Sequence, residues 1–245
     1  MAEDLRFLGL KEKGRPFPYA LLSSRPQFLS PVSEMINVLI VDDHPIVRRG
    51  LRAILKEEQD FSVAESSNAR EALDMIQANP CDLVVLDLEL PGMNGLDLLK
   101  QIKRDHKQIQ VLVLSVYPED QFAVRVLKAG ASGFLSKEAA PDQLVIAIRK
   151  ILGGRKHVSE RVAELLIQRF DEHTSGQLHE KLSDREFQIL CLIGEGKTIK
   201  QIANELSLSS PTVSTYRARI LDKMGLRSTA ELVKYAIQFR LADPR

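Results

Sequence analysis

Cysteine is scarce in this sequence, and long hydrophobic runs are absent. Neither Cys81 nor Cys191 has a second Cys or His at the spacing of a metal site. Both are therefore expected to be buried as small apolar residues. No apolar run reaches the roughly 18 residues that cross a membrane, and the N-terminus lacks the apolar core of a secretory signal. These absences favour a protein that has no membrane partner and is cytoplasmic.

A large net charge is also lacking, but the charge is unevenly spread. Residues 35–155 carry 15 Lys and Arg against 17 Asp and Glu (net −2), whereas residues 181–245 carry 11 against 7 (net +4). The C-terminal part is therefore expected to meet an acidic partner. The length of 245 residues is enough for two ordinary domains.

The first 34 residues lack any sustained period of 2 or 3.6 and contain four prolines. They are predicted to be a mostly disordered extension without chemistry of its own. Met35 stands immediately before the first predicted strand, so we hypothesise that translation in the cell begins there. Mass spectrometry of the native protein that found Met1 or Ala2 at its N-terminus would reject this hypothesis.

From Ile36 onward, short apolar runs alternate with stretches of helical period. The runs predict strands at 36–41, 61–66, 82–87, 109–115 and 133–136. The periodic stretches predict helices at about 45–57, 68–78, 95–106, 119–129 and 140–152. Strands that are apolar throughout are expected to be buried on both faces. The pattern therefore predicts an α/β domain at residues 35–155, with a flavodoxin-like, doubly wound, five-stranded parallel sheet.

After Gly153 and Gly154 the sequence changes character. Residues 158–171 predict one amphipathic helix, and a polar stretch follows it, so residues 156–180 are predicted to be a linker with a helix. Residues 181–245 show only helical pattern, with three short breaks. They predict a small all-α domain of four short helices.

Polar residues stand at the ends of four of the predicted strands. Asp42 and Asp43 follow the first strand, Asp87 ends the third, Ser115 ends the fourth and Lys137 follows the fifth. Because ligands of such sheets bind outside the carboxyl ends of the strands, these five side chains are expected to converge. Three carboxylates suit Mg²⁺, and Asp87 could then accept a phosphoryl group whose charge Lys137 neutralises and to which Ser115 donates. Any one of these aspartates could equally be a helix cap or a turn residue, but the set of five favours a site.

Residues 36–152 resemble the receiver domain of two-component response regulators, and the resemblance covers all of these motifs. It implies that a sensor histidine kinase phosphorylates Asp87. It also implies that Asp43 and Asp87 bind Mg²⁺ directly and that Asp42 acts more through water. In the segment "ELPGMNG" after Asp87, Gly and Pro fix a tight loop, so the Glu89 backbone carbonyl is also expected to face the metal.

The resemblance assigns further roles near the predicted phosphorylation site. Ser115 corresponds to the switch hydroxyl and Lys137 to the lysine that contacts the phosphoryl group. Phe134 corresponds to the switch aromatic, although an ordinary core phenylalanine fits the position equally well. Glu89 and Tyr117 occupy positions that border the attacking water and tune the lifetime of the aspartyl phosphate. His44 is expected to be a loop residue rather than a ligand, since the proline after it suits a first helical turn.

Residues 199–206 and 211–224 predict two helices joined by a turn, which is the spacing of a helix-turn-helix. The apolar face of the second helix should pack inward; it consists of Val213, Tyr216, Ile220 and Met224. The residues predicted to contact DNA are Thr212, Ser214, Thr215, Arg217, Ala218, Arg219 and Lys223. A charged helix face is more often merely solvated, but the net charge of +4 and the turn favour DNA.

The stretch resembles the LuxR-type helix-turn-helix of the NarL/FixJ class. Capping boxes are predicted for the pairs Ser183–Glu186 and Ser228–Glu231. Tyr216 stands where that class usually has His, and Ile199 where it often has Asn. These departures concern individual phosphate contacts rather than the fold.

Together these features predict a phosphorylation-controlled, DNA-binding transcriptional regulator. A phosphoryl group brings about −1.5 to −2 of charge to Asp87, which should draw Ser115 toward it and bias interdomain contacts or dimerisation. The expected partners are a cognate sensor histidine kinase, double-stranded promoter DNA, RNA polymerase and a second phosphorylated copy. In such a homodimer, paired helices would meet two half-sites about 34–36 Å apart.

Three alternatives are weaker. A phosphatase of the haloacid dehalogenase type has a second Asp two residues after the nucleophile and a cap domain, whereas this chain has Glu89 there and no cap domain. A dinucleotide-binding enzyme is disfavoured because no G-x-G-x-x-G follows the first strand. No enzyme activity is therefore expected beyond Mg²⁺-dependent self-phosphorylation and dephosphorylation at Asp87. The third alternative is a receiver that acts only through protein contacts, which a salt-independent retention on duplex DNA would favour.

Overall fold

The computed structural model describes residues 35–117, 119–171, 177–239 and 241–242. The disordered extension predicted for residues 1–34 lies outside the described residues. The described helices and strands agree with the predicted ones to within one or two residues at most ends.

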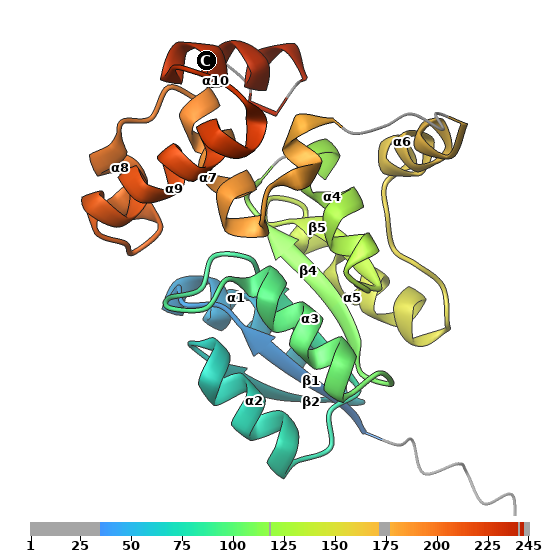
Figure 1. The fold of residues 1–245 in the computed structure, drawn as a ribbon. Helices are drawn as coiled ribbons and strands as arrows, with labels where there is room; N and C mark the ends of the chain where they lie inside the picture. The colour runs from blue at the N-terminus through green and yellow to red at the C-terminus, as the bar shows by residue number, and fades with distance from the viewer. Residues whose placement is uncertain (1–34, 118, 172–176, 240, 243–245) are drawn as a thin grey trace, which may run out of the picture. The chain divides into compact units, whose positions relative to one another are not determined.

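A five-stranded parallel sheet forms the first part of the described chain (Figure 1). Its strands are β1 (Ile36–Val41), β2 (Phe61–Ser66), β3 (Leu83–Asp87), β4 (Gln110–Ser115) and β5 (Gly133–Ser136). The spatial order is β2-β1-β3-β4-β5, which confirms the predicted parallel sheet. The chain moves to one side of β1 to form β2 and to the other side to form β3, so the loops that follow β1 and β3 diverge.

Two hydrophobic clusters cover the two faces of the sheet. The helices of this part are α1 (Pro45–Lys56), α2 (Ala69–Ala78), α3 (Gly95–Asp105), α4 (Glu119–Lys128) and α5 (Ala140–Leu152). Val38 and Ile40 pack with residues of α1 and α5, whereas Leu39 and Val41 pack with residues of α2, α3 and α4. This alternation is the period of 2 that a strand imposes, and it confirms helices on both faces.

The edge strand β2 departs from the predicted burial on both faces. Its inner residues alternate between exposed and partly buried, whereas all five residues of β3 are buried. Edge position alone does not explain this, since the other edge strand, β5, is mostly buried; β2 also carries the polar residues Ser62 and Glu65. The burial on both faces expected of strands that are apolar throughout therefore does not extend to β2.

Helices make up the rest of the described chain. They are α6 (Glu160–Asp171), the 3₁₀ helix η1 (Leu178–Lys181), α7 (Asp184–Gly194), α8 (Ile199–Glu205), α9 (Ser210–Met224) and α10 (Thr229–Gln238). The stretch predicted as a polar linker therefore ends in a short helix. A Gly at the end of α9, Gly225, has φ +64°, the left-handed conformation that commonly stops a helix.

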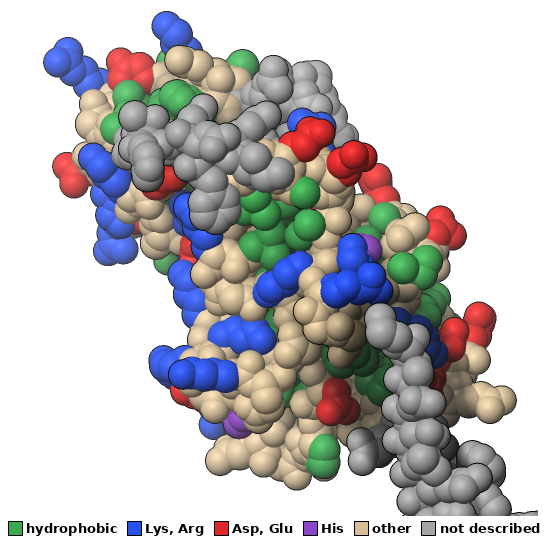
Figure 2. Space-filling view, turned by 90° about the vertical axis from the view of Figure 1, so that its right-hand side faces the viewer, with side chains coloured by type: hydrophobic (Ala, Val, Ile, Leu, Met, Phe, Trp, Pro, Cys, Tyr) green, Lys and Arg blue, Asp and Glu red, His purple; other side chains and the backbone are tan. Residues whose placement is uncertain are grey.

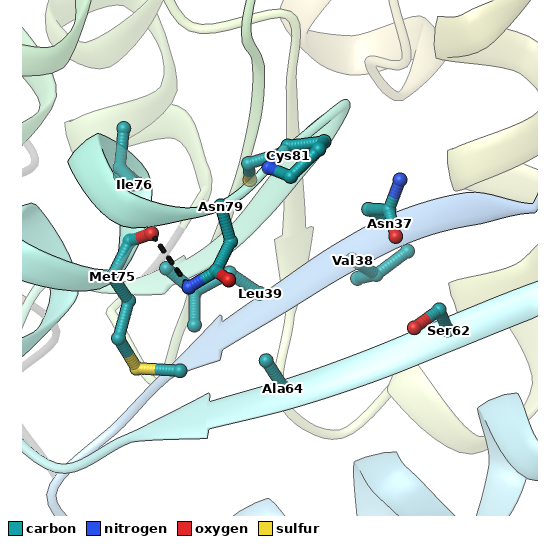
Figure 3. Close-up of a pocket in the computed structure, with 10 residues that line it drawn as sticks. Asn37, Val38, Leu39, Ser62, Ala64, Met75, Ile76, Asn79 and Cys81 are labelled. Atoms are coloured by element: carbon teal, nitrogen blue, oxygen red, sulfur yellow. Dashed lines mark hydrogen bonds between the residues drawn. The ribbon is translucent and has the colours of Figure 1, made fainter.

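A cavity of about 330 Å³ lies beside β1, β2 and the end of α2 (Figure 3). Cys81 lines it and is only partly buried, so the prediction of a buried residue is wrong at this position. Burial still raises the pKa of the Cys81 thiol to about 11, and its Sγ lies 3.6 Å from the Leu83 carbonyl oxygen. Cys191 is fully buried in α7, as predicted.

Candidate functional site

The carboxyl ends of the strands bring the predicted charged side chains together. Lys137 Nζ lies 2.7 Å from Asp87 Oδ2 and 2.8 Å from Asp42 Oδ2. Both aspartates are 1% exposed. A buried carboxylate is costly unless it is paired, so a single ammonium stabilises two of them at once. These side chains converge as the sequence predicts, but the ion pair between Lys137 and Asp42 was not predicted.

The same residues form a cluster that fits a divalent cation. Asp42, Asp43, His44 and Asp87 each offer one ligand atom, and these four atoms all lie within 4.8 Å of one another. Asp87 Oδ1 is buried and has no hydrogen-bond partner among the described residues. The three carboxylates outnumber the one ammonium, which leaves net negative charge for a cation to neutralise. This acidic cluster is therefore a candidate divalent-metal site.

Burial governs the protonation of Asp87. Burial and the nearby Asp42 outweigh the lowering effect of Lys137, and together these effects raise the pKa of the Asp87 carboxyl to about 7. Burial alone would lower the pKa of Lys137, but the charges of Asp87 and Asp42 outweigh burial, so that pKa is raised. Lys137 is therefore a firmly positive partner, while Asp87 needs additional positive charge to remain ionised near neutral pH.

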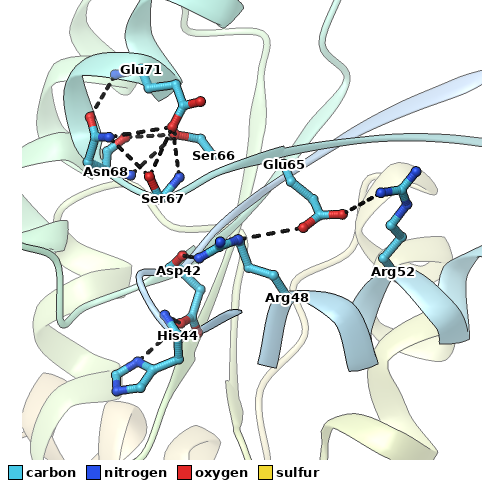
Figure 4. A network of polar contacts seen from close by, with 9 residues as sticks. All are labelled: Asp42, His44, Arg48, Arg52, Glu65, Ser66, Ser67, Asn68 and Glu71. Carbon is cyan, nitrogen blue, oxygen red and sulfur yellow. Dashed lines mark hydrogen bonds and ion pairs between the residues drawn. The ribbon is translucent and has the colours of Figure 1, made fainter. Parts of the chain in front are cut away.

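His44 and Arg48, which follow the acidic pair in the sequence, hold the loop that carries it (Figure 4). The His44 backbone N–H donates to Asp42 Oδ1 at 2.7 Å, and its Nδ1 lies 2.7 Å from Asp43 Oδ1. Arg48 donates to the Asp42 backbone carbonyl at 2.6 Å and also lies near Glu65. His44 is a loop residue before α1, as predicted, but its ring also lies beside the carboxylates. The contact between Arg48 and Asp42 was not predicted from the sequence. The one feature that could have indicated it is the position of Arg48 in the first turn of α1, close to the acidic pair.

A glycine fixes the loop after β3. A Cβ added at Gly95 would lie only 2.2 Å from the Asp87 backbone oxygen, and the Gly95 N–H donates to the Leu88 carbonyl at 3.1 Å. The start of α3 therefore packs directly against the backbone of Asp87. Asn94 begins this helix with its side chain, which accepts from the Leu96 N–H at 2.8 Å. The orientation of the Glu89 carbonyl toward a metal stays a prediction.

Ser115 and Phe134 are both buried in the sheet region. Ser115 is 0% exposed, and its Oγ accepts a hydrogen bond from the Tyr117 backbone N–H at 3.1 Å. The Lys137 N–H donates to the Ser115 carbonyl at 2.9 Å. Phe134 is 1% exposed and belongs to the core. In this conformation Phe134 is a core residue, and its role as a switch stays a prediction.

The helix-turn-helix consists of α8 and α9. The inward face of α9 buries Val213, Ile220 and Met224, whereas Tyr216 is partly buried. The residues predicted to contact DNA are exposed at Ser214, Thr215, Ala218, Arg219 and Lys223, and partly buried at Thr212 and Arg217. Lys and Arg side chains form several separate groups on the face shown in Figure 2, so positive charge alone does not identify the DNA-binding surface. The burial of α9 thus agrees with the prediction: its apolar face lies inward, and most of the residues predicted to contact DNA are exposed.

Two of the cationic residues on α9 have partners within the helical part. Arg217 donates to Thr229 Oγ1 at 3.0 Å, and Lys223 Nζ lies 2.7 Å from Glu186 Oε2. Contacts with DNA phosphates would have to compete with these partners. Ser214 and Ala218 are exposed and uncharged, so contacts with DNA at these two positions would not have to break an ion pair.

The helix caps agree with the prediction at one position and differ at another. Ser183 and Glu186 form the predicted capping box at the start of α7. At α10, Ser228 accepts from the Glu231 N–H, but the Glu231 carboxylate accepts from the Arg227 N–H at 2.7 Å. The second predicted capping box is therefore only half formed, because the carboxylate reaches one residue further back. A further box, Thr198 with Gln201, opens α8 and was not predicted.

Helix α7 also contacts the first part of the chain. Arg125 of α4 donates to Asp184 Oδ1 at 2.8 Å, and its guanidinium carbon lies 4.3 Å from the centroid of the Phe187 ring. Phe187 meets Phe122 edge to face, with 5.2 Å between ring centroids. Buried side chains of both parts accordingly belong to one hydrophobic cluster.

The fold and the acidic site define a receiver domain followed by a helical effector domain. Residues 38–149 match the family described as "Response regulator receiver domain". Residues 180–236 match the family described as "Bacterial regulatory proteins, luxR family". The first match lies within the range predicted for the receiver, and the second begins one residue before the range of 181–245 predicted for the helical domain.

Whole-chain relatives and solved structures extend the match. The response regulator UvrY of Escherichia coli O6:H1 is 35% identical over 211 residues, which are 85% of this chain and 97% of UvrY. The response regulator GacA of Pseudomonas aeruginosa is 33% identical, over 85% of this chain and 99% of GacA. RcsB from Salmonella enterica serovar Typhimurium, solved bound to the promoter rprA with phosphomimetic BeF3-, is 26% identical with a TM-score of 0.54. That match covers 82% of this chain and 98% of RcsB.

The chain therefore belongs to the response regulators, as a phosphorylation-dependent, DNA-binding transcription regulator of the NarL/FixJ class. The family is one of transcription regulators. None of the helices in the described ranges is long and apolar enough to cross a membrane.

Proposed function

We propose that a cognate sensor histidine kinase phosphorylates Asp87 and thereby controls promoter binding by residues 181–245. The observation that carries this proposal is the environment of Asp87. One of its oxygens, Oδ1, has no hydrogen-bond partner among the described residues, while the other lies 2.7 Å from Lys137. An unpaired carboxylate oxygen beside a fixed cation is suited to attack a phosphoryl group and to stabilise the charge that group brings.

In the proposed reaction, an Asp87 carboxylate oxygen forms a bond to the phosphorus of a phosphohistidine. The phosphorus–nitrogen bond breaks, and the donor imidazole keeps its electron pair and takes up a proton. Mg²⁺ held by Asp42, Asp43 and Asp87, with the Glu89 carbonyl, would neutralise negative charge on the transferred oxygens. Lys137 contacts the phosphoryl group from the side of β5.

The same site would act as a switch. Ser115 is the last residue of β4, and its Oγ accepts a hydrogen bond from the Tyr117 N–H, so movement of this hydroxyl toward the phosphoryl group would displace the backbone of Tyr117. Phe134 lies on the neighbouring strand, paired with Val113. Phosphorylation would thereby favour a second arrangement of this edge of the sheet, which promotes dimerisation.

The DNA-binding surface would be the exposed face of α9. Ser214, Thr215 and Ala218 would approach base edges. Thr212, Arg217, Arg219 and Lys223 would contact phosphates. Solved complexes titled as RcsB dimers bound to DNA support binding by a homodimer. RNA polymerase at the promoter is the expected further partner, and the cytoplasm the expected location.

We assign residues 35–155 to the receiver, 156–180 to the linker and 181–245 to the DNA-binding domain. The test of the central assignment is labelling of the full chain with radiolabelled acetyl phosphate in the presence of Mg²⁺. Asp87→Asn should abolish the label. Asp82→Asn is the matched control, because Asp82 is an exposed aspartate just before the same strand and should leave labelling unchanged.

Two results would contradict the proposal. Retention of the label in Asp87→Asn would place the phosphoryl group elsewhere. Control of DNA binding would be refuted if the phosphorylated and unphosphorylated wild-type chains bound promoter fragments with equal affinity. Chelation of Mg²⁺ is expected to stop labelling of the wild type.

A further inference from the structure

Gln188 of α7 reaches from the helical domain to the region of the phosphorylation site. It is 1% exposed, and its Nε2 donates to the Tyr117 hydroxyl oxygen at 2.7 Å. Its Oε1 accepts from Arg185 at 2.7 Å and from Asn94 Nδ2 at 3.2 Å. Both ends of this amide are therefore occupied, which fixes its orientation. With Oε1 held by two donors, only the NH₂ group can face Tyr117.

Tyr117 transmits this orientation to Glu89. Its ring stacks on Phe122 with 4.5 Å between centroids, and it is 4% exposed, so packing holds the ring in place. Because the hydroxyl oxygen accepts from Gln188, the hydroxyl proton is directed elsewhere. Glu89 lies two residues after Asp87; burial raises the pKa of its carboxyl and the Tyr117 hydroxyl lowers it, while Oε1 is buried without a hydrogen-bond partner among the described residues. Gln188 thus fixes the Tyr117 hydroxyl by a hydrogen bond, and that hydroxyl in turn acts on the charge of the Glu89 carboxylate.

Glu89 lines a cleft of about 310 Å³ that opens onto the acidic site. The receiver residues of this cleft include Asp43, His44 and Glu89. The helical-domain residues of the cleft include Arg185, Asn204 and Glu205. Water that reaches a phosphoryl group on Asp87 through this cleft therefore passes the Glu89 carboxylate.

Loss of the phosphoryl group from Asp87 is a hydrolysis. A water oxygen forms a bond to phosphorus, and the bond between phosphorus and the Asp87 oxygen breaks and returns its electron pair to the carboxylate. Inorganic phosphate leaves, with the proton from water on the phosphate. A carboxylate in the cleft speeds this step if it is available to orient the water, and slows it if a neighbour occupies it.

We infer that Gln188 is a positioning residue for this hydrolysis: through Tyr117 it keeps the Glu89 carboxylate engaged and so prolongs the life of the phosphoryl group. The inference rests on the phosphorylation of Asp87 proposed above. It follows that the aspartyl phosphate is shortest-lived when α7 has moved away from the receiver.

The test uses the full chain, labelled with radiolabelled acetyl phosphate, freed of donor and followed for loss of label. Gln188→Met keeps the side-chain length and removes the hydrogen bonds. It is expected to lose label about fivefold faster, the size expected when one hydrogen bond is removed. Tyr117→Phe should have a similar effect. The double variant should be no faster than either single variant, because both changes break the same chain of contacts.

Lys100→Met is the matched control. Lys100 contacts Asp184, the residue that begins α7, and the structure records no contact between Lys100 and Tyr117 in the described ranges. Its rate of loss should equal that of the wild type. Gln188→Asn, which keeps the amide but shortens its reach, serves as a second variant if Gln188→Met does not fold.

The outcomes separate this inference from the proposed function. Equal rates for wild type and the Gln188 variants would overturn the inference, and so would an acceleration in Lys100→Met as large as that in Gln188→Met. Additive effects of the Gln188 and Tyr117 changes would also overturn it. Label that persists in Asp87→Asn would instead overturn the proposed phosphorylation site.

Discussion

Lys137 Nζ lies 2.7 Å from Asp87 Oδ2, although 50 residues separate the two in the sequence. The contact exists because β3 and β5 are parallel and end at the same edge of the sheet, with β4 between them. Both residues are largely buried, with side-chain exposures of 13% and 1%. The pair therefore links the stability of the receiver to the charge of its site.

Lys137→Met is expected to destabilise the chain in the absence of divalent cations. It leaves Asp42 and Asp87 buried without their ammonium, and breaking a buried pair in this way costs about 3 kcal/mol. Added Mg²⁺ should restore part of the loss, because it supplies the missing positive charge. Urea unfolding with and without Mg²⁺ measures both effects. A deficit that Mg²⁺ does not reduce would contradict the proposed metal site.

Gly95→Ala is expected to destabilise the receiver and to slow phosphorylation. The new Cβ would lie 2.2 Å from the Asp87 carbonyl oxygen, so the backbone must shift, which costs roughly 1–3 kcal/mol. Gly50→Ala is the matched control, since nothing lies within 4 Å of a Cβ there and Gly50 is inside α1. It should stabilise the chain by about 0.5–1 kcal/mol. Equal thermal stability of the two variants would contradict this account.

Glu186→Gln is expected to destabilise the helical domain at neutral pH but not in acid. Burial alone would raise the pKa of the Glu186 carboxyl, but Lys223 and the Ser183 N–H outweigh burial and lower it. A lowered pKa stabilises the folded state above the ordinary Glu value, and this stabilisation is lost as the pH falls through the folded pKa. Losing the charged cap should cost about 1 kcal/mol near pH 7.

The measurement is the free energy of unfolding of wild type and Glu186→Gln at pH values from about 7 down to about 3. The difference between the two proteins should shrink as the pH decreases. A difference that stays constant over this range would show that the charge of Glu186 contributes nothing. Lys223→Met should reproduce the pH dependence, because it removes the cation that lowers the pKa.

Arg219→Ala is expected to weaken binding to promoter DNA and to non-specific duplex by a similar factor. Arg219 is exposed on α9, where a guanidinium suits a phosphate contact rather than a base contact. The slope of log affinity against log salt should become shallower by about 1. Arg70→Ala, an equally exposed change on α2, should leave affinity and slope as they are. An unchanged slope in Arg219→Ala would remove this residue from the DNA surface.

The elements and the site could be predicted largely from local patterns. The five strands and the helices between them are visible because apolar runs and periods of 3.6 reflect burial directly. The convergence of Asp42, Asp87 and Lys137 followed from one rule, that parallel strands end together. The positions of β2 and β5 at the two edges could not be predicted, because strand order is decided by the packing of the whole sheet.

Side-chain partners were harder to predict than positions. Glu231 accepts from Arg227 rather than from Ser228, a difference that depends on the exact path of the backbone. Lys223 was predicted to face DNA, and it is exposed, yet it also pairs with Glu186 of α7. Such pairs connect residues far apart in sequence, and no local pattern records them.

The sequence by itself determined the two kinds of domain and the residues at the strand ends, because period, strand ends and turn spacing are local properties of the chain. Only the tertiary structure decided that Gln188 meets Tyr117 and that Lys137 is shared between two carboxylates. Those contacts depend on how separate elements pack. The packing is set by the shape of a shared hydrophobic core rather than by any single stretch of sequence.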